Sequence, residues 1–129
     1  MMASKARLFG DDLAVAQVLA AQTPAAAKAL GRTVRGFDEH VWVEARYAIV
    51  RAGTLAKFSQ HRDLNAALAG TETQVLAEAN PTDRIWGIGL AAGDPDVERP
   101  SRWRGLNLLG FALMDTRDQL AGRSASERD

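Results

Sequence analysis

Cysteine is missing from the 129 residues of this sequence. Its absence excludes disulfide bonds, thiolate nucleophiles and cysteine-ligated metal sites, and it suits the reducing environment of the cytoplasm. Histidine is scarce as well, because His40 and His61 are the only two and neither has a second ligand at the spacing of a zinc motif. We therefore expect no structural zinc.

Charge of one sign and long apolar runs are also lacking. Sixteen basic residues balance sixteen acidic ones, so no overall field draws the protein to nucleic acid or to an anionic membrane. No apolar stretch approaches the roughly 20 residues of a membrane-spanning helix, and the first five residues are not followed by a signal-type hydrophobic region. We expect one soluble cytoplasmic domain with no membrane contact, whose oligomeric state the sequence leaves open.

Helix signals dominate what is present. Apolar residues recur at three- and four-residue intervals along residues 39–60, which is typical of a buried helical stripe. The expected capping residues are Asp11 or Asp12, Thr23, Asp38 and Asn107. Periodicity, caps and the glycines that follow several segments predict helices at residues 5–9, 13–21, 24–30, 39–60, 63–68 and 108–120.

Three segments break the helical pattern. Residues 74–79 have the composition of a short strand, which Asn80-Pro81 would end. Residues 91–105 contain two prolines, two glycines and a run of charges, and they predict a long irregular excursion on the surface. Residues 124–129 are polar, and we expect them to form a tail after Gly122.

The best candidate for a site is residues 83–89, Asp-Arg-Ile-Trp-Gly-Ile-Gly. A carboxylate can stabilise positive charge or activate water, and an arginine can bind phosphate. An indole can stack on a planar base, and glycines let a ligand approach the backbone closely. On composition alone, a tight turn anchored by its tryptophan explains the same residues and is the favoured interpretation.

The order of motifs along the chain adds a second kind of information. It resembles that of the NADAR family, also called YbiA-like proteins, through KARLFGD at 5–11, ALGR at 29–32, Trp42, AKF at 56–58, DRIWGIG at 83–89, WRGLNLLG at 103–110 and LMDTR at 113–117. The resemblance implies a mainly helical fold with a small β component (α+β). It implies a single compact domain over residues 1–123, with residues 124–129 as its tail.

The resemblance also implies an activity, namely hydrolysis of N-glycosidic bonds without a cofactor. In the family, the substrates are phosphoribosylamino intermediates of riboflavin synthesis or ADP-ribose attached to guanine bases. The expected partner is therefore a small ribose-phosphate or ADP-ribose ligand, or ADP-ribosylated DNA. Cleavage passes through an oxocarbenium-like state, which a nearby carboxylate stabilises while water is activated to attack.

Carried over residue by residue, the resemblance assigns catalysis to Asp83 and Trp86. It assigns substrate binding to Trp42, Arg32, Lys5, Lys57, Arg84, Gly87, Asn107 and Arg117. For several of these residues a purely structural role is the alternative: Trp42 as a core anchor, Lys57 as a charge that complements the helix dipole, and Arg117 as one side of a surface ion pair.

The sequence departs from the family pattern at its beginning. The family's first motif opens with a glutamate that is taken to be catalytic, after an aromatic-rich segment, and this sequence begins at Met1 just past that position. We favour a start that lies upstream, and the alternative is a truncated protein with impaired activity. The departure makes a second hypothesis credible, a module that binds ADP-ribose or NAD without cleaving it. A third possibility is a helical interaction domain.

Overall fold

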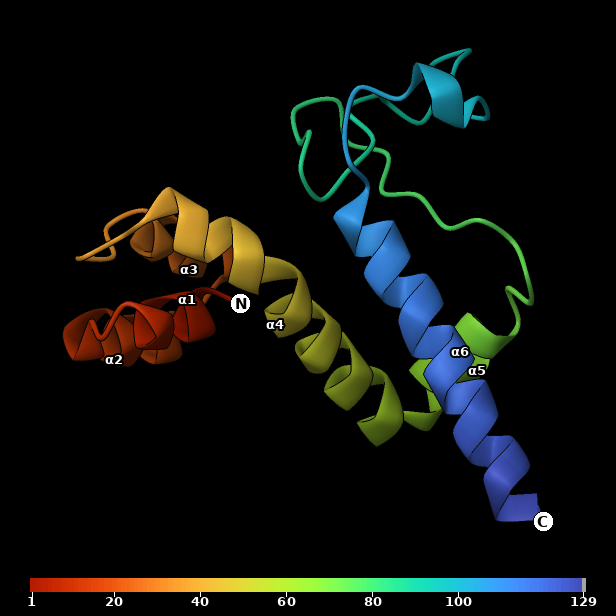
Figure 1. Cartoon of the computed structure of the whole chain (residues 1–129), viewed down its shortest axis with the longest axis horizontal. Helices are drawn as coiled ribbons and strands as arrows, with labels where there is room; N and C mark the ends of the chain where they lie inside the picture. The colour runs from red at the N-terminus through yellow and green to blue at the C-terminus, as the bar shows by residue number, and fades with distance from the viewer. Residues whose placement is uncertain (129) are drawn as a thin grey trace. The chain divides into compact units, whose positions relative to one another are not determined.

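The computed structural model describes the backbone of residues 1–128 and the side chains of residues 1–122. The described chain is mainly helical, as expected (Figure 1). Its elements are α1 (Met2–Leu8), α2 (Asp12–Ala20), α3 (Pro24–Gly31), α4 (Glu39–Gln60), α5 (Arg62–Ala69), the 3-10 helix η1 (Pro100–Arg102) and α6 (Leu108–Arg128). The chain divides into two compact units, the first ending at Val50 and the second beginning at Arg51, so that α4 contributes to both.

The first unit is built from α1, α2 and α3, which pack against one another. Its core consists of Ala6, Ala14 and Val34, with Phe9 and Val15 packed against them. The two helical residues of the core, Ala6 on α1 and Ala14 on α2, are both alanines, whose small side chains let these short helices approach closely.

Asp11 joins two parts of the first unit. One carboxylate oxygen, Oδ1, accepts a hydrogen bond from the Ala14 N–H (3.0 Å) and caps α2, and Oδ2 accepts one from the Arg35 N–H (2.8 Å). The two N–H groups, Arg35 first, lower the pKa of Asp11 from its ordinary value. The sequence left the cap open between Asp11 and Asp12, and the structure selects Asp11.

Two further caps are confirmed. Thr23 Oγ1 accepts from the Ala26 N–H (3.1 Å) at the start of α3. Asp38 Oδ1 accepts from the His40 and Val41 N–H groups (2.9 and 3.2 Å) at the start of α4. Helix α4 has the expected bounds, because its cap and its periodic pattern are both local properties of the sequence.

The second unit contains the rest of α4, the helices α5 and α6 that pack on each other, and the irregular chain between them. The expected strand at residues 74–79 is not found, and residues 1–128 contain no strand. This segment pairs with a side chain: Asn107 Nδ2 donates to the Leu76 carbonyl (2.9 Å) and Asn107 Oδ1 accepts from the Glu78 N–H (3.0 Å). One amide satisfies one donor and one acceptor, so it cannot build the ladder that a strand needs.

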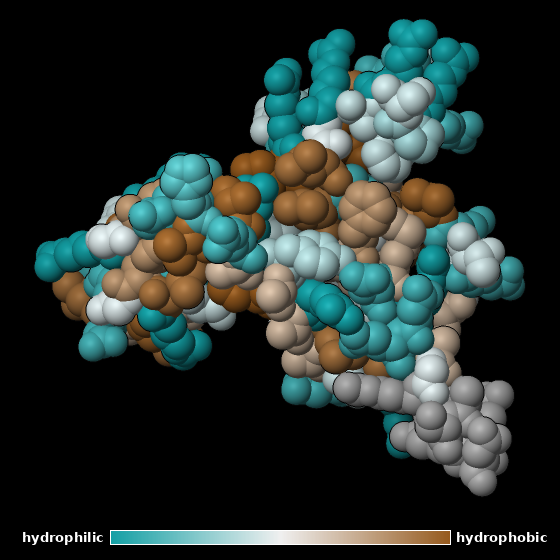
Figure 2. Space-filling view, in the orientation of Figure 1, coloured by the Kyte–Doolittle hydropathy of each residue, from teal (hydrophilic) through white to brown (hydrophobic). Residues whose placement is uncertain are grey.

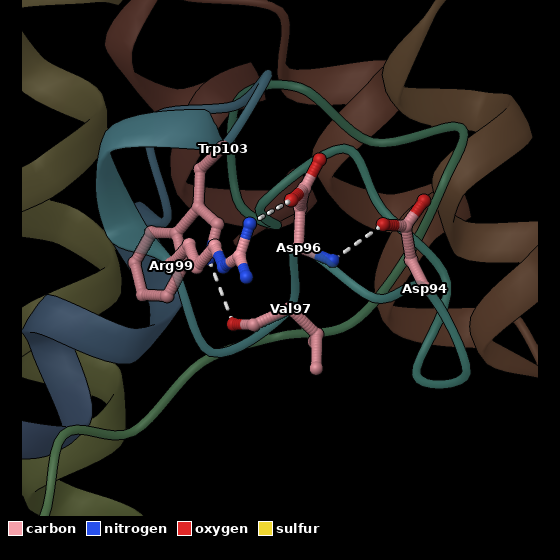
Figure 3. Close-up of polar contacts among 5 residues, drawn as sticks. All are labelled: Asp94, Asp96, Val97, Arg99 and Trp103. Carbon is pink, nitrogen blue, oxygen red and sulfur yellow. Dashed lines mark hydrogen bonds and ion pairs between the residues drawn. The ribbon is translucent and has the colours of Figure 1, made fainter.

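The irregular excursion at residues 91–105 is confirmed and folds on itself (Figure 3). Asp94 Oδ1 accepts from the Asp96 N–H (2.8 Å), and the Asp96 carboxylate pairs with Arg99 at 3.6 Å. Trp103 Nε1 donates to the Val97 carbonyl (2.9 Å), just after η1. The side chains of this excursion are largely hydrophilic on the face seen in Figure 2.

Helix α6 is longer than the sequence predicts. It continues past Gly122 to Arg128, so the expected end at residue 120 is wrong, and residues 124–128 of the expected tail are helical. A glycine inside a helix costs only about 1 kcal/mol relative to alanine, which is too little to stop a helix by itself. Asp129 lies outside the described residues. Within the described chain, none of the helices has both the length and the apolar content needed to cross a bilayer.

Candidate functional site

The Asp83 loop, residues 83–89, is fixed by hydrogen bonds from the chain that leads into α6. Five backbone N–H groups donate to its carbonyls: Arg104 to Ile88 (2.8 Å), Leu106 to Arg84 (2.9 Å), Asn107 to Gly87 (3.0 Å), Leu108 to Ile85 (3.1 Å) and Leu109 to Trp86 (3.1 Å). The last two donors belong to the first turn of α6, where N–H groups have no partner within the helix. The loop therefore covers the beginning of α6 and is held by backbone contacts.

Two glycines allow this close backbone approach. A Cβ on Gly105 would collide with the Gly87 carbonyl oxygen, and a Cβ on Gly87 would lie 2.9 Å from the carbonyl oxygens of Asp83 and Glu78. Real Cβ atoms do not come so near to backbone oxygens, so both positions exclude a side chain. Gly87, predicted to contact substrate, is thus buried and has a packing role that accounts for its identity.

Asp83 is half-buried, and one of its oxygens is occupied by the loop itself. Oδ1 accepts from the Ile85 N–H (3.0 Å) and from the Trp86 N–H (2.9 Å). Among the described residues, no hydrogen bond falls on Oδ2. The arrangement is an Asx turn that also orients a carboxylate rigidly, and such a carboxylate can stabilise developing positive charge with its second oxygen.

The other predicted residues of the second unit have different environments. Trp86, three residues after Asp83, is half-buried, and Arg84 and Lys57 are exposed. Lys57 Nζ lies 5.9 Å from the centroid of the Phe58 ring. Asn107 is fully buried, and its amide hydrogen-bonds the Leu76 carbonyl and the Glu78 N–H.

Arg117 ties α6 to the turn after α5. Its Nη1 donates to Thr71 Oγ1 (2.9 Å) and to the Gln74 carbonyl (2.8 Å), whereas its Nε is buried without a partner among the described residues. A cavity of about 360 Å³ lies beside it, with Leu68 and Leu120 in its wall. None of the other predicted site residues lines that cavity.

In the first unit, the structure brings Lys5 and Trp42 together with two phenylalanines. We call Lys5, Phe9, Phe37 and Trp42 the Lys5 cluster. Lys5 Nζ lies 4.7 Å from the Phe37 ring centroid and 5.4 Å from the Trp42 ring centroid, both within the range of cation–π attraction. The Phe9 and Phe37 rings are 5.3 Å apart at an interplanar angle of 59°.

Burial lowers the pKa of Lys5 from its ordinary value, and the charge of Glu39 opposes this by raising it. Trp42 is buried on the first turn of α4, as the core-anchor alternative requires, yet it also contacts the lysine. Arg32 is exposed at the end of α3. Phe37 was not singled out from the sequence, where its only signal is an aromatic residue between Gly36 and the α4 cap Asp38.

The described residues contain no group of three or more histidine, aspartate or glutamate side chains placed to hold a metal ion. Two groups stand out for their chemistry: an oriented carboxylate in the second unit, and a partly buried ammonium against aromatic rings in the first.

Comparison with known proteins agrees with the motif order. N-glycosidase R617 of Acanthamoeba polyphaga mimivirus is 40% identical over 119 residues, which cover 92% of this chain and 70% of the relative. Protein irg-1 of Caenorhabditis elegans is 38% identical over 121 residues, covering 92% and 57%. N-glycosidase YbiA of Escherichia coli (strain K12) is 29% identical over 117 residues, covering 91% and 66%.

The chain thus spans between 57% and 70% of the lengths of these relatives. A sequence model described as the NADAR domain matches residues 1–121, nearly the whole chain. With this match and a relative at 40% identity, the chain belongs to the NADAR domain family.

Proposed function

We propose that the protein is an N-glycosidase that hydrolyses the bond between the anomeric carbon and a nitrogen of a ribose-phosphate or ADP-ribose derivative. The observation that carries this proposal is the Asp83 carboxylate, which two backbone N–H groups hold on one oxygen while the other stays available. The proposal is supported by family membership and by relatives named N-glycosidase, R617 and YbiA among them.

The chemistry needs few groups. As the carbon–nitrogen bond breaks, positive charge builds on the anomeric carbon, and Asp83 Oδ2 stabilises it. A water molecule forms the new carbon–oxygen bond, and its proton is transferred to the departing nitrogen. Trp86 shields the reacting bond from bulk solvent, and Lys57 and Arg84, which belong to the same unit as Asp83, are the candidates for the phosphate groups.

We favour a small metabolite in the cytoplasm as substrate, such as a phosphoribosylamino intermediate of riboflavin synthesis. The formal net charge of +0 supports this choice, because sequence-independent binding of duplex DNA rests on several lysine or arginine contacts to phosphates. ADP-ribosylated guanine in DNA is the second substrate class.

A second candidate function is a module that binds ADP-ribose or NAD without cleaving it. One observation favours it: Asp83 Oδ1 and both polar atoms of the Asn107 amide serve the protein's own backbone, as they would in a purely structural turn. In that case the Asp83 loop supports the fold, and ligand binding depends on other residues.

The test is to incubate the purified protein with the phosphoribosylamino intermediates and, separately, with ADP-ribosylated DNA. Release of ribose phosphate or ADP-ribose is followed by liquid chromatography and mass spectrometry. Turnover of either substrate supports the glycosidase. Calorimetric binding of ADP-ribose without any turnover supports the binding module, and neither turnover nor binding would contradict both.

A further inference from the structure

The cavity beside Arg117 lies within the second unit, between α5 and α6, which pack on each other (Figure 1). Leu68 and Leu120, which are both buried, form apolar wall. The charged side chains in its wall are Arg117, Glu72 and Asp118. Its volume of about 360 Å³ is at the small end of the range of about 300–1,000 Å³ that is typical of small-molecule sites. The cavity therefore combines an apolar surface with charges of both signs.

The guanidinium of Arg117 is only partly used by the protein. A guanidinium carries five N–H donors, and in Arg117 only Nη1 has acceptors, Thr71 Oγ1 and the Gln74 carbonyl. Nε is buried without a partner, and Nη2 likewise has none among the described residues. The unused donors of a half-buried cation in the wall of a cavity can bind a carboxylate of a ligand.

The two carboxylates in the wall are unpaired as well. Among the residues whose side chains the structure describes, no ion pair involves Glu72, Asp118 or Arg117. Glu72 and Asp118 are exposed, whereas Arg117 is half-buried. Although these side chains line the same cavity, the carboxylates do not neutralise the guanidinium. A ligand that carries charges of both signs would therefore find a partner for each.

These charges distinguish between classes of small ligand. An anion would be attracted to Arg117 but repelled by Glu72 and Asp118, and a cation would meet the opposite combination. An uncharged apolar molecule would cover Arg117 Nη2 without giving it an acceptor, which costs free energy. A zwitterion with an apolar body avoids all three costs.

We propose that this cavity binds a free α-amino acid with an apolar side chain. The α-carboxylate of the ligand accepts hydrogen bonds from Arg117 Nη2, and its α-ammonium lies against the carboxylates of Glu72 and Asp118. Its side chain packs on Leu68 and Leu120.

The amino-acid site is separate from the Asp83 loop. The loop accepts its last hydrogen bond from the N–H of Leu109, in the first turn of α6. Arg117 follows just over two turns later, which places it about 12 Å further along the helix. The site therefore adds a second ligand to the protein, and it does not depend on the proposed N-glycosidase function.

Four small molecules separate the three features of such a ligand. L-leucine has all of them, whereas isocaproate lacks the ammonium, isoamylamine lacks the carboxylate, and glycine lacks the apolar side chain. We expect L-leucine to bind to the full chain, and each of the other three to bind about tenfold more weakly or worse, because each loses a charge-assisted hydrogen bond or an apolar contact. Isothermal titration calorimetry measures all four.

Two variants and a matched control locate the site. Glu72→Gln should weaken L-leucine binding about tenfold and leave isocaproate, which has no ammonium, no weaker. Glu78→Gln is the control, because Glu78 is also an exposed glutamate of the second unit but does not line the cavity. Ala121→Leu enlarges an exposed side chain in the cavity wall and should abolish L-leucine binding at an unchanged melting temperature. Arg117 stays unchanged, because its Nη1 bonds also hold the fold.

The amino-acid site is overturned if L-leucine does not bind, or if isocaproate, isoamylamine or glycine binds as tightly as L-leucine. Equal affinities of Glu72→Gln and Glu78→Gln for L-leucine would also overturn it, as would full binding in Ala121→Leu. None of these measurements involves turnover, so failure of the site and failure of the proposed glycosidase are distinguishable.

Discussion

The Asp83 loop and the Lys5 cluster, one in each compact unit, are held in place in different ways. Backbone N–H groups of residues 104–109 fix the loop, and its glycines are required because backbone meets backbone. In the Lys5 cluster, the contacts between segments distant in the sequence are made by side chains, a cation against two rings. The first arrangement leaves no room for added atoms, whereas the second leaves the Phe37 ring 43% exposed, and we expect it to tolerate substitution.

Because the Asp83 loop is fixed by close backbone contacts, adding one methyl group at Gly105 should destabilise it strongly. In Gly105→Ala, the new Cβ meets the Gly87 carbonyl oxygen and backbone atoms of Arg84 and Ile88, none of which can rotate away. We expect the free energy of unfolding, measured by urea denaturation, to fall by about 3 kcal/mol. Gly93→Ala is the control, because nothing lies within 4 Å of its Cβ, and an equal loss in both variants would contradict the rigid loop.

Removing the Asn107 side chain, which hydrogen-bonds the backbone of the segment predicted to be a strand, should have the next largest effect on stability. Asn107→Ala leaves the Leu76 carbonyl and the Glu78 N–H without their partner, at a cost of about 2 kcal/mol in unfolding free energy. Asn107 also has a φ of +53°, so Asn107→Gly should be about 1 kcal/mol less damaging than Asn107→Ala. Identical stability of the two variants would show that the backbone conformation contributes nothing.

Substitution in the Lys5 cluster should change stability little. Lys5→Met keeps the apolar stem and removes the cation, and the cation–π contacts of a partly exposed ammonium contribute only about 0.5–1 kcal/mol. We therefore expect a fall of less than about 1 kcal/mol in the unfolding free energy. A loss as large as that of Gly105→Ala would mean that the cluster is a structural core after all.

The smallest effect is a pH dependence in the first unit. The pKa of Asp11 is lower in the folded protein, so its contribution to stability is complete above the ordinary pKa of an aspartate and is lost as the pH falls through the lowered value. Thermal unfolding followed by circular dichroism between about pH 4 and pH 2 should show this loss. Asp11→Asn should flatten that part of the profile, and an unchanged profile would assign the acid sensitivity to other carboxylates.

The parts of the fold that follow from the sequence are those fixed over short distances. Thr23 and Asp38 cap their helices through N–H groups two or three residues away, and the Asp83 turn closes over the same distance. The expected strand was wrong because its partner, Asn107, lies about 30 residues further along and acts through a side chain. Phe37 was missed for the same reason, since its neighbours Lys5 and Phe9 come from another segment.

The most direct test compares two aspartates that each hold a turn through Oδ1. Asp83 Oδ1 accepts the Ile85 and Trp86 N–H groups and Asp94 Oδ1 accepts the Asp96 N–H, and asparagine at either position keeps that oxygen and removes the charge. We predict that Asp83→Asn lowers kcat/KM for N-glycoside hydrolysis about 100-fold or more at an unchanged melting temperature, and that Asp94→Asn leaves kcat/KM unchanged. Wild-type activity in Asp83→Asn would show that Asp83 is a turn residue and contradict its catalytic role.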